Sequence, residues 1–228
     1  MKVSVITVCL NAYNTLHRCL DSVKNQNYQE IEQIIVDGRS TDGTQKIIES
    51  YKKNINKIII EKDKGIYDAM NKGLKKIKNN WVIFLNSGDV FYKKNTLTNV
   101  KKCILNNRNA DIIIGKNVLS NKPNRLTKFK RISKNTYSSS FSHQSIYFKK
   151  KIFEYKKYNI NYKIAADFEL MKYLYYKNYK IIYSNYVFSS SKPEGISDKK
   201  RFIAIREFYK ISRKYDKSLF LNLWYYNN

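Results

Sequence analysis

The sequence of 228 residues has few of the residues that interrupt regular structure, with 7 glycines and 2 prolines. This scarcity excludes collagen-like and linker-rich architectures. The three cysteines, Cys9, Cys19 and Cys103, lack the paired spacing of a zinc site, and we expect buried free thiols. No apolar run approaches the ~20 residues that a membrane-spanning helix requires. A chain of this length can bury enough surface to fold without a metal or a disulfide.

Acidic residues are also scarce: 18 Asp and Glu stand against 44 Lys and Arg, a net charge of +26. Part of this excess fits a codon bias that also enriches Asn, Ile and Tyr, and such lysines would only solvate the surface. The remainder indicates an anionic partner: nucleotide phosphates, nucleic acid or an anionic membrane surface. The hydrophobic content of 43% excludes a disordered chain.

The first ten residues alternate in polarity and lead directly into polar residues, so they indicate a strand and not a signal sequence. We therefore expect a cytoplasmic protein, or one that lies peripherally on the inner face of the cell membrane. Helix-like segments alternate with apolar strands as far as Gly115, which predicts an α/β fold with a doubly wound, mostly parallel sheet and flanking helices. The predicted strands are Val3–Leu10, Ile31–Asp37, Lys57–Glu61, Trp81–Asn86 and Asp111–Gly115.

The alternation stops after Gly115, and the pattern predicts three parts: 1–115, 116–197 and 198–228. The middle part carries a weak strand near Leu126–Ile132, a helix over Ala166–Tyr176 and a short strand over Lys180–Ser184. The last part predicts a basic helical tail.

Polar residues follow the strands of the first part, with Asn11, Asp37, Asp63 and Asp89 at or just after their ends. One such residue is commonly a helix cap or a turn residue. Several of them meet at one edge of a parallel sheet, where α/β proteins bind ligands. In a basic protein this predicts recognition of a ribose or a base, together with a divalent cation that holds phosphates.

Four segments occur in a characteristic order: VSVITVCLNAYNTL, IIVDGRSTDGT, DKGIYDAMNKG and WVIFLNSGD. In this order and spacing the chain resembles family 2 glycosyltransferases of the GT-A fold, in particular small bacterial enzymes of surface-polysaccharide assembly. The resemblance covers residues 1–115 and resumes at FSHQSIYFKK and AADFELMKYL, as far as about residue 197. It implies that 1–115 binds the nucleotide-sugar and that 116–197 forms the acceptor side of the same catalytic domain.

The resemblance also implies roles for individual residues. Asp37 would contact the nucleotide base, where a carboxylate can accept the imide N–H of uracil. Asp68 and Asn71 would contact the nucleotide or donor sugar, although Asp68 could instead form a surface ion pair with Lys72. The implied nucleotide-sugar residues are Val8, Asn11, Asp37, Asp68, Asn71, Asn86 and Ser87.

Asp89 ends LNSGD and would bind Mg²⁺ or Mn²⁺, with Asn86 as a neutral oxygen donor nearby. Many relatives have two adjacent acids at this point, whereas here Gly88 replaces the first, so one carboxylate and the diphosphate would hold the cation. His143 would line the diphosphate or acceptor side, or else pack as a polar residue at a strand end.

Asp167 stands where the family has its catalytic acid, at the start of a predicted helix. A helix N-terminus favours the ionised carboxylate, as a general base requires. The alternative is an acid that only stabilises the helix dipole. Glu169 is a reserve candidate on the acceptor or diphosphate side.

These residues predict an inverting glycosyltransferase that moves a sugar from a nucleoside-diphosphate sugar, UDP being favoured, to a hydroxyl of a glycan or lipid-linked acceptor. A sugar nucleotidyltransferase is an alternative, but the first loop, LNAYNTL, lacks the glycines of a phosphate loop. A nucleic-acid-binding protein is another, but no recognition motif is present and we expect no nucleic acid partner. The basic tail either packs on the catalytic domain or lies on an anionic membrane surface.

Overall fold

The computed structural model describes residues 1–126, 131–139, 141–192 and 200–215. The helices are α1 (Leu16–Lys24), α2 (Thr44–Ser50), α3 (Ile66–Leu74), α4 (Thr96–Asn106), α5 (Ile152–Tyr155), α6 (Ala166–Tyr176) and α8 (Arg201–Tyr215), with 3₁₀ turns η1 (Lys52–Asn54) and η2 (His143–Ser145). The strands are β1 (Val3–Cys9), β2 (Ile31–Asp37), β3 (Lys57–Ile60), β4 (Trp81–Phe84), β5 (Val90–Phe91), β6 (Ile112–Leu119), β7 (Lys122–Leu126), β8 (Ile146–Lys149) and β9 (Ile181–Ser191).

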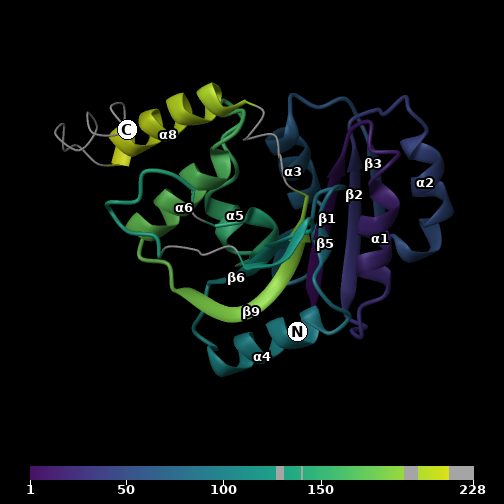
Figure 1. The fold of residues 1–228 in the computed structure, drawn as a ribbon, viewed down its shortest axis with the longest axis horizontal. Helices are drawn as coiled ribbons and strands as arrows, with labels where there is room; N and C mark the ends of the chain where they lie inside the picture. Colours follow the sequence, from purple (N-terminus) through teal and green to yellow (C-terminus); the bar gives the residue numbers. More distant parts are fainter. Residues whose placement is uncertain (127–130, 140, 193–199, 216–228) are drawn as a thin grey trace.

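One sheet runs through the whole molecule in the order β3-β2-β1-β4-β8-β6-β9-β5, with β7 paired to β6. The strands β3, β2, β1 and β4 are parallel, and Ile6 at the centre of β1 pairs with Ile34 of β2 and Phe84 of β4. The strand β8 then enters antiparallel between β4 and β6, whereas β9 is parallel to β6. The predicted α/β architecture with a doubly wound sheet is confirmed (Figure 1).

Alternate residues of the strands reach opposite faces of the sheet, as the period of two requires. In β1, Ile6 and Val8 belong to the core cluster that includes α3 and α6. Val3 and Val5 belong to the cluster formed with α1 and α4. Because both faces are covered by helices, the parallel strands β1, β2 and β4 consist almost entirely of buried residues, whereas β3 at the edge of the sheet is partly exposed.

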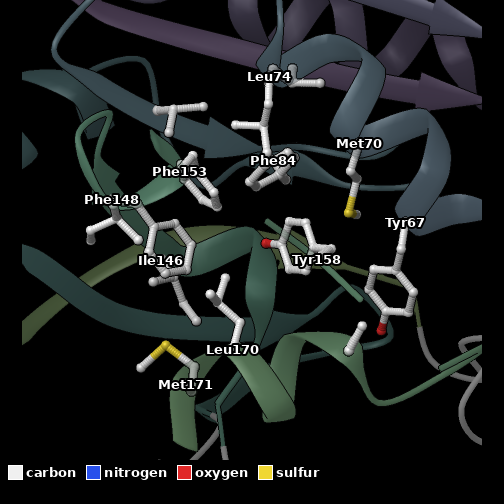
Figure 2. Packing of buried hydrophobic residues seen from close by; sticks show 14 of the residues in the cluster. Tyr67, Met70, Leu74, Phe84, Ile146, Phe148, Phe153, Tyr158, Leu170 and Met171 are labelled. Atoms are coloured by element: carbon white, nitrogen blue, oxygen red, sulfur yellow. The ribbon is translucent and has the colours of Figure 1, made fainter. Parts of the chain in front are cut away.

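The largest core cluster lies between the sheet and α6 and joins the two halves of the chain (Figure 2). Met70 and Leu74 of α3 approach it from one side, and Leu170 and Met171 of α6 from the other. Aromatic rings fill the space between them, in edge or tilted contacts with centroids 5.2–6.0 Å apart. These rings belong to Phe84, Phe148, Phe153 and Tyr158. The core therefore holds 1–115 and 116–197 in fixed contact.

The helix α8 packs on the outer side of α6 and not on the sheet (Figure 1). Phe168 and Phe208 meet edge to face at 5.2 Å, and Tyr176 stacks on Tyr215 at 5.5 Å. The first part of the predicted tail is thus a docked helix, whereas 198–199 and 216–228 lie outside the described residues. Across the described ranges, no helix is both long and apolar enough to cross a membrane.

Several local predictions differ from the structure. The strand β8 and the short helix α5 were not among the predicted elements, and β9 continues to Ser191, well beyond the predicted Lys180–Ser184. The weak strand expected near Leu126–Ile132 shares only Leu126 with β7, and residues 131–132 are not in a strand; residues 127–130 lie outside the described ranges.

Candidate active site

The first two strands end in loops that are tied to each other by side chains. Asn11 follows β1 with a positive φ of 49° and accepts the Thr41 N–H at 3.0 Å through Oδ1. The Asn11 N–H donates to Ser40 Oγ at 2.8 Å. In the same loops Asp42 accepts the N–H groups of Tyr13 at 2.9 Å and Thr44 at 3.0 Å. The predicted convergence of strand ends is therefore present, and these loops form one continuous rim.

Asp37, the last residue of β2, lies fully buried beneath this rim. Its carboxylate accepts the Ser40 N–H at 3.0 Å, the Ser40 hydroxyl and Gln45 Nε2 at 3.3 Å. Burial and the nearby Asp37 charge raise the pKa of the Cys9 thiol far above its ordinary value, so Cys9 is an inert neighbour. The Cys9 thiol also donates to Asp37 Oδ1 at 3.6 Å, so each carboxylate oxygen has two donors and Asp37 orders the 38–45 loop.

The third strand ends beside the same loop. A Cβ added to Gly38 would lie 2.5 Å from Asp63 Oδ2, so only glycine leaves room for Asp63 at this point. Asp63 Oδ1 accepts the N–H of Gly65, whose φ of 121° suits glycine. The loops after β1, β2 and β3 therefore meet at a single edge of the sheet.

The structure gives Asp68 and Asn71 different surroundings. Asp68 accepts the Lys64 N–H at 2.9 Å and lies 3.7 Å from Lys72 Nζ, which is the ion pair considered as an alternative. Asn71 donates to the Tyr158 carbonyl at 2.8 Å and accepts the Tyr158 N–H at 3.1 Å. Because both ends of its amide are occupied, Asn71 anchors the segment after α5 to α3 and is not presented with Asp68 to a ligand.

Asn86, Asp89 and His143 gather after β4. Asn86 Nδ2 lies 2.7 Å from His143 Nε2. His143 Nε2 also lies 3.9 Å from Asp89 Oδ2. The Ser87 N–H donates to the Val8 carbonyl at 3.3 Å, which fixes this loop against the end of β1. The predicted residues Val8, Asn86, Ser87, Asp89 and His143 are therefore brought together.

Burial governs the ionisation of this group. It raises the pKa of Asp89 to about 7 and lowers the pKa of His143 to about 4, so the imidazole is neutral at neutral pH. Among the described residues, Asn86 Oδ1 is buried with no hydrogen-bond partner. An orphaned amide oxygen beside a desolvated carboxylate is an oxygen donor set that suits Mg²⁺ or Mn²⁺.

The protein alone offers an incomplete set of ligands at this point. In the part of the chain that the structure describes, no group of three or more His, Cys, Asp and Glu side chains is placed to hold a metal ion. A cation at Asp89 would thus take most of its remaining ligands from a bound diphosphate and from water, as Mg²⁺ commonly does.

Asp167 lies in the first turn of α6, as predicted. Its Oδ1 accepts the Phe168 N–H at 2.7 Å and the Tyr67 hydroxyl at 3.3 Å. Burial raises the pKa of Asp167 to about 6, although both of these donors favour the ionised form. A part-buried carboxylate whose pKa lies near neutrality has the properties of a general base.

Glu169 differs from its expected place on the acceptor or diphosphate side. It is fully buried and bound by Lys156 Nζ at 3.0 Å, Lys214 Nζ at 2.8 Å and the Tyr215 hydroxyl at 2.9 Å. Although burial alone would raise it, these partners lower the pKa of Glu169 below its ordinary value. The two lysines and the tyrosine hydroxyl hold Glu169 as the ionic link between α6, α8 and the segment after α5.

Two contributors to the site were missed from the sequence. Tyr67 lies on α3, and its hydroxyl proton is shared between the Ile164 carbonyl at 2.5 Å and Asp167 Oδ1 at 3.3 Å. Its signal was its position one residue before Asp68 within DKGIYDAMNKG. Gln45, which donates to Asp37, gave no comparable signal because it lies on an ordinary helix.

The fold and site together define a class: a GT-A-type glycosyltransferase domain, in which a mostly parallel sheet presents acidic loops at one edge. Residues 4–177 match the family described as Glycosyl transferase family 2. The chain belongs to this family, which confirms the resemblance predicted from its motifs. This membership favours the glycosyltransferase prediction over the nucleotidyltransferase and nucleic-acid alternatives.

Individual bacterial proteins are also similar to this chain. The PGL/p-HBAD biosynthesis glycosyltransferase of Mycobacterium tuberculosis is 29% identical over 170 residues, 73% of this chain and 66% of that protein. The Bacillus subtilis protein TuaG, named for teichuronic acid biosynthesis, is 38% identical over 94 residues, 40% of this chain and 37% of that protein. S. aureus TarS in complex with UDP-GlcNAc superposes with a TM-score of 0.76 at 22% identity, over 94% of this chain and 65% of that chain. The chain thus spans about two thirds of the length of the mycobacterial relative.

Proposed function

We propose that this protein transfers a sugar from a UDP-sugar to a hydroxyl of a glycan or lipid-linked acceptor in cell-surface polysaccharide synthesis, with inversion at the anomeric carbon. The observation that carries the proposal is the Asp167 carboxylate, part-buried at the start of α6 with a pKa raised to about 6. The surface-glycan relatives and the UDP-GlcNAc complex of TarS support the substrate class.

In the proposed reaction Asp167 removes the proton from the acceptor hydroxyl as its oxygen attacks the anomeric carbon. The bond between that carbon and the diphosphate breaks on the opposite side, so a single displacement inverts the configuration. Tyr67 donates to Asp167 and holds the carboxylate in place through the step. The departing UDP carries the negative charge, and stabilising it is commonly the largest electrostatic contribution.

The nucleotide would lie at the rim formed by the loops after β1 and β2. Asp37 would accept the imide N–H of uracil there through an adjustment of the 38–45 loop, since the carboxylate is buried in the present conformation. Asn11 and Ser40 fix the shape of that loop. In that conformation the imide N–H would replace one of the donors that Asp37 has within the protein, and a site that hydrogen-bonds a substrate N–H discriminates against a base that lacks it.

Asp89 and Asn86 would hold Mg²⁺ or Mn²⁺, with His143 beside them. The buried, unpartnered Asn86 Oδ1 and the desolvated Asp89 carboxylate support this assignment. A bound divalent cation supplies positive charge against the diphosphate. Gly88 gives the loop no second carboxylate, so binding of the cation is expected to depend on the nucleotide.

The test is a binding and turnover series on the purified protein. UDP, GDP and dTDP are titrated with and without Mn²⁺, and the release of nucleoside diphosphate from UDP-glucose, UDP-galactose and UDP-GlcNAc is measured without acceptor. UDP should bind most tightly, and at least one UDP-sugar should be hydrolysed slowly. Pyrophosphate-dependent release of UTP would instead indicate a nucleotidyltransferase, and tighter binding of GDP or dTDP would overturn the choice of uracil.

The proposal includes a location on an anionic membrane surface. The outer face of α8 exposes Phe202, which is 86% accessible, together with Ile203 and Ile205. Exposed basic residues flank them: Arg201, Arg206 and Lys210. Apolar side chains within a basic helix face are typical of interfacial helices, and each basic residue near an anionic surface contributes ~1 kcal/mol.

Vesicle co-sedimentation tests this location. The protein should bind phosphatidylglycerol-containing vesicles at low salt and not phosphatidylcholine vesicles, and Phe202→Ser should weaken binding several-fold. Tyr155→Ser is the matched control, because Tyr155 is an aromatic residue exposed to 75% on α5. If the unmodified protein ignores anionic vesicles at low salt, the proposed location is wrong.

A further inference from the structure

Glu207 of α8 binds a backbone segment outside its own helix. Its Oε1 accepts the Lys163 N–H at 2.7 Å, and its Oε2 accepts the N–H groups of Ile164 and Ala165, both at 2.9 Å. Three consecutive backbone donors thus converge on one carboxylate. Hydrogen bonds to an ionised acceptor are shorter and stronger than neutral ones.

The segment that Glu207 holds leads directly into α6 and Asp167. The N-terminus of a helix and the turn before it present backbone N–H groups that need acceptors. Here the acceptor comes from a different helix, α8, about 40 residues further along the chain. The position of the first turn of α6, which carries Asp167, therefore depends on α8.

The same segment is held from its other side by α3. The Tyr67 hydroxyl donates both to the Ile164 carbonyl and to Asp167 Oδ1. Ile164 thus has its N–H bound by Glu207 and its carbonyl bound by Tyr67. A shift of this segment would move Asp167 relative to Tyr67 and to the donor rim.

The attachment of α8 has a second, separate point. At the other end of the helix, Lys214 and Tyr215 bind the buried Glu169. Glu207 is the single acid between Arg201 and Tyr215, a helix that is otherwise basic. Besides the aromatic contacts of Phe208 and Tyr215, α8 therefore has two polar anchors, and within the described part of the chain only the Glu207 anchor binds the backbone just before Asp167.

We propose that Glu207 is a positioning residue for the general base: through the backbone of Lys163–Ala165 it fixes the place of Asp167. This rests on the proposed function, in which Asp167 accepts the proton. Glu207 itself need not contact donor or acceptor. Since a misplacement of about 1 Å can lower turnover about 100-fold, loss of this contact should reduce kcat more than it affects nucleotide binding.

The test compares Glu207→Ala and Glu207→Gln with Lys214→Met in the full chain. Lys214→Met weakens the second anchor of the same helix and leaves Lys163–Ala165 untouched, so it controls for loosened docking of α8. For each variant we would measure the Tm, the Kd for UDP, and kcat and KM for hydrolysis of the UDP-sugar that the unmodified protein cleaves fastest.

Glu207→Ala should lower kcat about tenfold or more, with KM and the Kd for UDP within twofold of the unmodified protein. Glu207→Gln keeps one acceptor oxygen, so its kcat should lie between those of Glu207→Ala and the unmodified protein. Lys214→Met should lower the Tm and retain kcat. Equal losses of kcat in Glu207→Ala and Lys214→Met, or an unchanged kcat in Glu207→Ala, would overturn the proposal.

Amide hydrogen exchange gives a readout that does not depend on turnover. Glu207→Ala should accelerate exchange of the Lys163–Ala165 amides at least about tenfold, whereas Lys214→Met should not, because only Glu207 accepts these donors. If the unmodified protein hydrolyses no UDP-sugar, the proposed function fails, but the exchange experiment still decides whether Glu207 holds the segment. Unchanged exchange in Glu207→Ala would overturn the positioning role by itself.

Discussion

Transfer should depend on pH through Asp167. A general base must be ionised to accept a proton, and burial raises the pKa of Asp167 from the ordinary 3.8 to about 6. Activity should therefore be fully present above this pKa and decline as the pH falls through it. Because kcat/KM reports the ionisations of the free enzyme, this decline at low pH, the acidic limb of the profile, should be measured in kcat/KM.

The magnitude follows from the ionised fraction. With a pKa of about 6, roughly nine-tenths of the protein carries the ionised base at pH 7 and roughly one-tenth at pH 5. An Asp with its ordinary pKa would lose almost nothing over the same interval. Burial raises the pKa of Asp167 most, the Phe168 N–H, the Tyr67 hydroxyl and the N–H of Asp167 itself lower it, and the Glu207 charge raises it.

The substitution Tyr67→Phe tests whether the acidic limb of the pH profile belongs to Asp167. It removes a donor to the ionised carboxylate, worth about 0.5–1.5 kcal/mol, so the limb should move up by about half to one pH unit. This matters because burial also raises the pKa of Asp89, to about 7. Tyr67 contacts Asp167 and has no contact with Asp89 among the described residues, so a limb that moves belongs to Asp167.

The assay is the release of UDP from a UDP-sugar between pH 4.5 and 8.5, for the unmodified protein, Tyr67→Phe and Asp167→Asn. Asp167→Asn should lower turnover about 100-fold or more and abolish the limb, while binding of UDP stays nearly intact. A profile that is flat down to pH 4.5, or near-normal transfer by Asp167→Asn, would refute the assignment of the base.

Three further predictions concern the donor side and the fold. Asp89→Ala should weaken UDP binding in the presence of Mn²⁺ and change it little without the cation, as measured by calorimetry; equal weakening in both would contradict a metal ligand. Asp37→Ala should reduce affinity for UDP and not for pyrophosphate, and equal losses for the two would place its role at the phosphates or in the fold. Gly115→Ala puts a Cβ 2.0 Å from Phe188 Cδ2 and should destabilise the protein by about 1–3 kcal/mol in urea titrations, whereas Gly88→Ala meets no atom within 4 Å and should leave its stability unchanged.

The sequence was informative where structure is determined locally. The alternation of helix-like segments and apolar strands as far as Gly115 predicted the α/β architecture, and the bounds of α6 were predicted without error. The strand β8 was missed because four residues, Ile146–Lys149, carry too little pattern. Its place is set by pairing with β4 on one side and β6 on the other, both of which are distant in the chain. Such pairing has no local signature.

The same division applies to the site. Asn11, Asp37 and Asp63 could be grouped from the sequence because parallel strands place their ends at one edge. The surroundings of Asn71 and Glu169 could not be predicted from the sequence, because their partners come from distant segments. Asn71 binds the Tyr158 backbone, and Glu169 binds Lys156 and Lys214. Glu207 is the one acid in the otherwise basic segment Arg201–Tyr215, and the spacing of apolar residues gave no indication of its role.

The late insertion of β8 has a consequence for synthesis on the ribosome. The strands β1 to β4 emerge within the first 84 residues and can pair in parallel. The free edge of β4 stays unpaired until β8, residues 146–149, has been synthesised. At about 5–20 residues per second, this edge stays open for roughly 3–12 s. During that interval the nascent chain exposes the apolar sequence of Trp81–Phe84, which is fully or almost fully buried in the finished protein. An open apolar edge is a template for pairing with other chains, so the nascent protein should be most prone to aggregate, and most in need of a chaperone, between these two points of elongation.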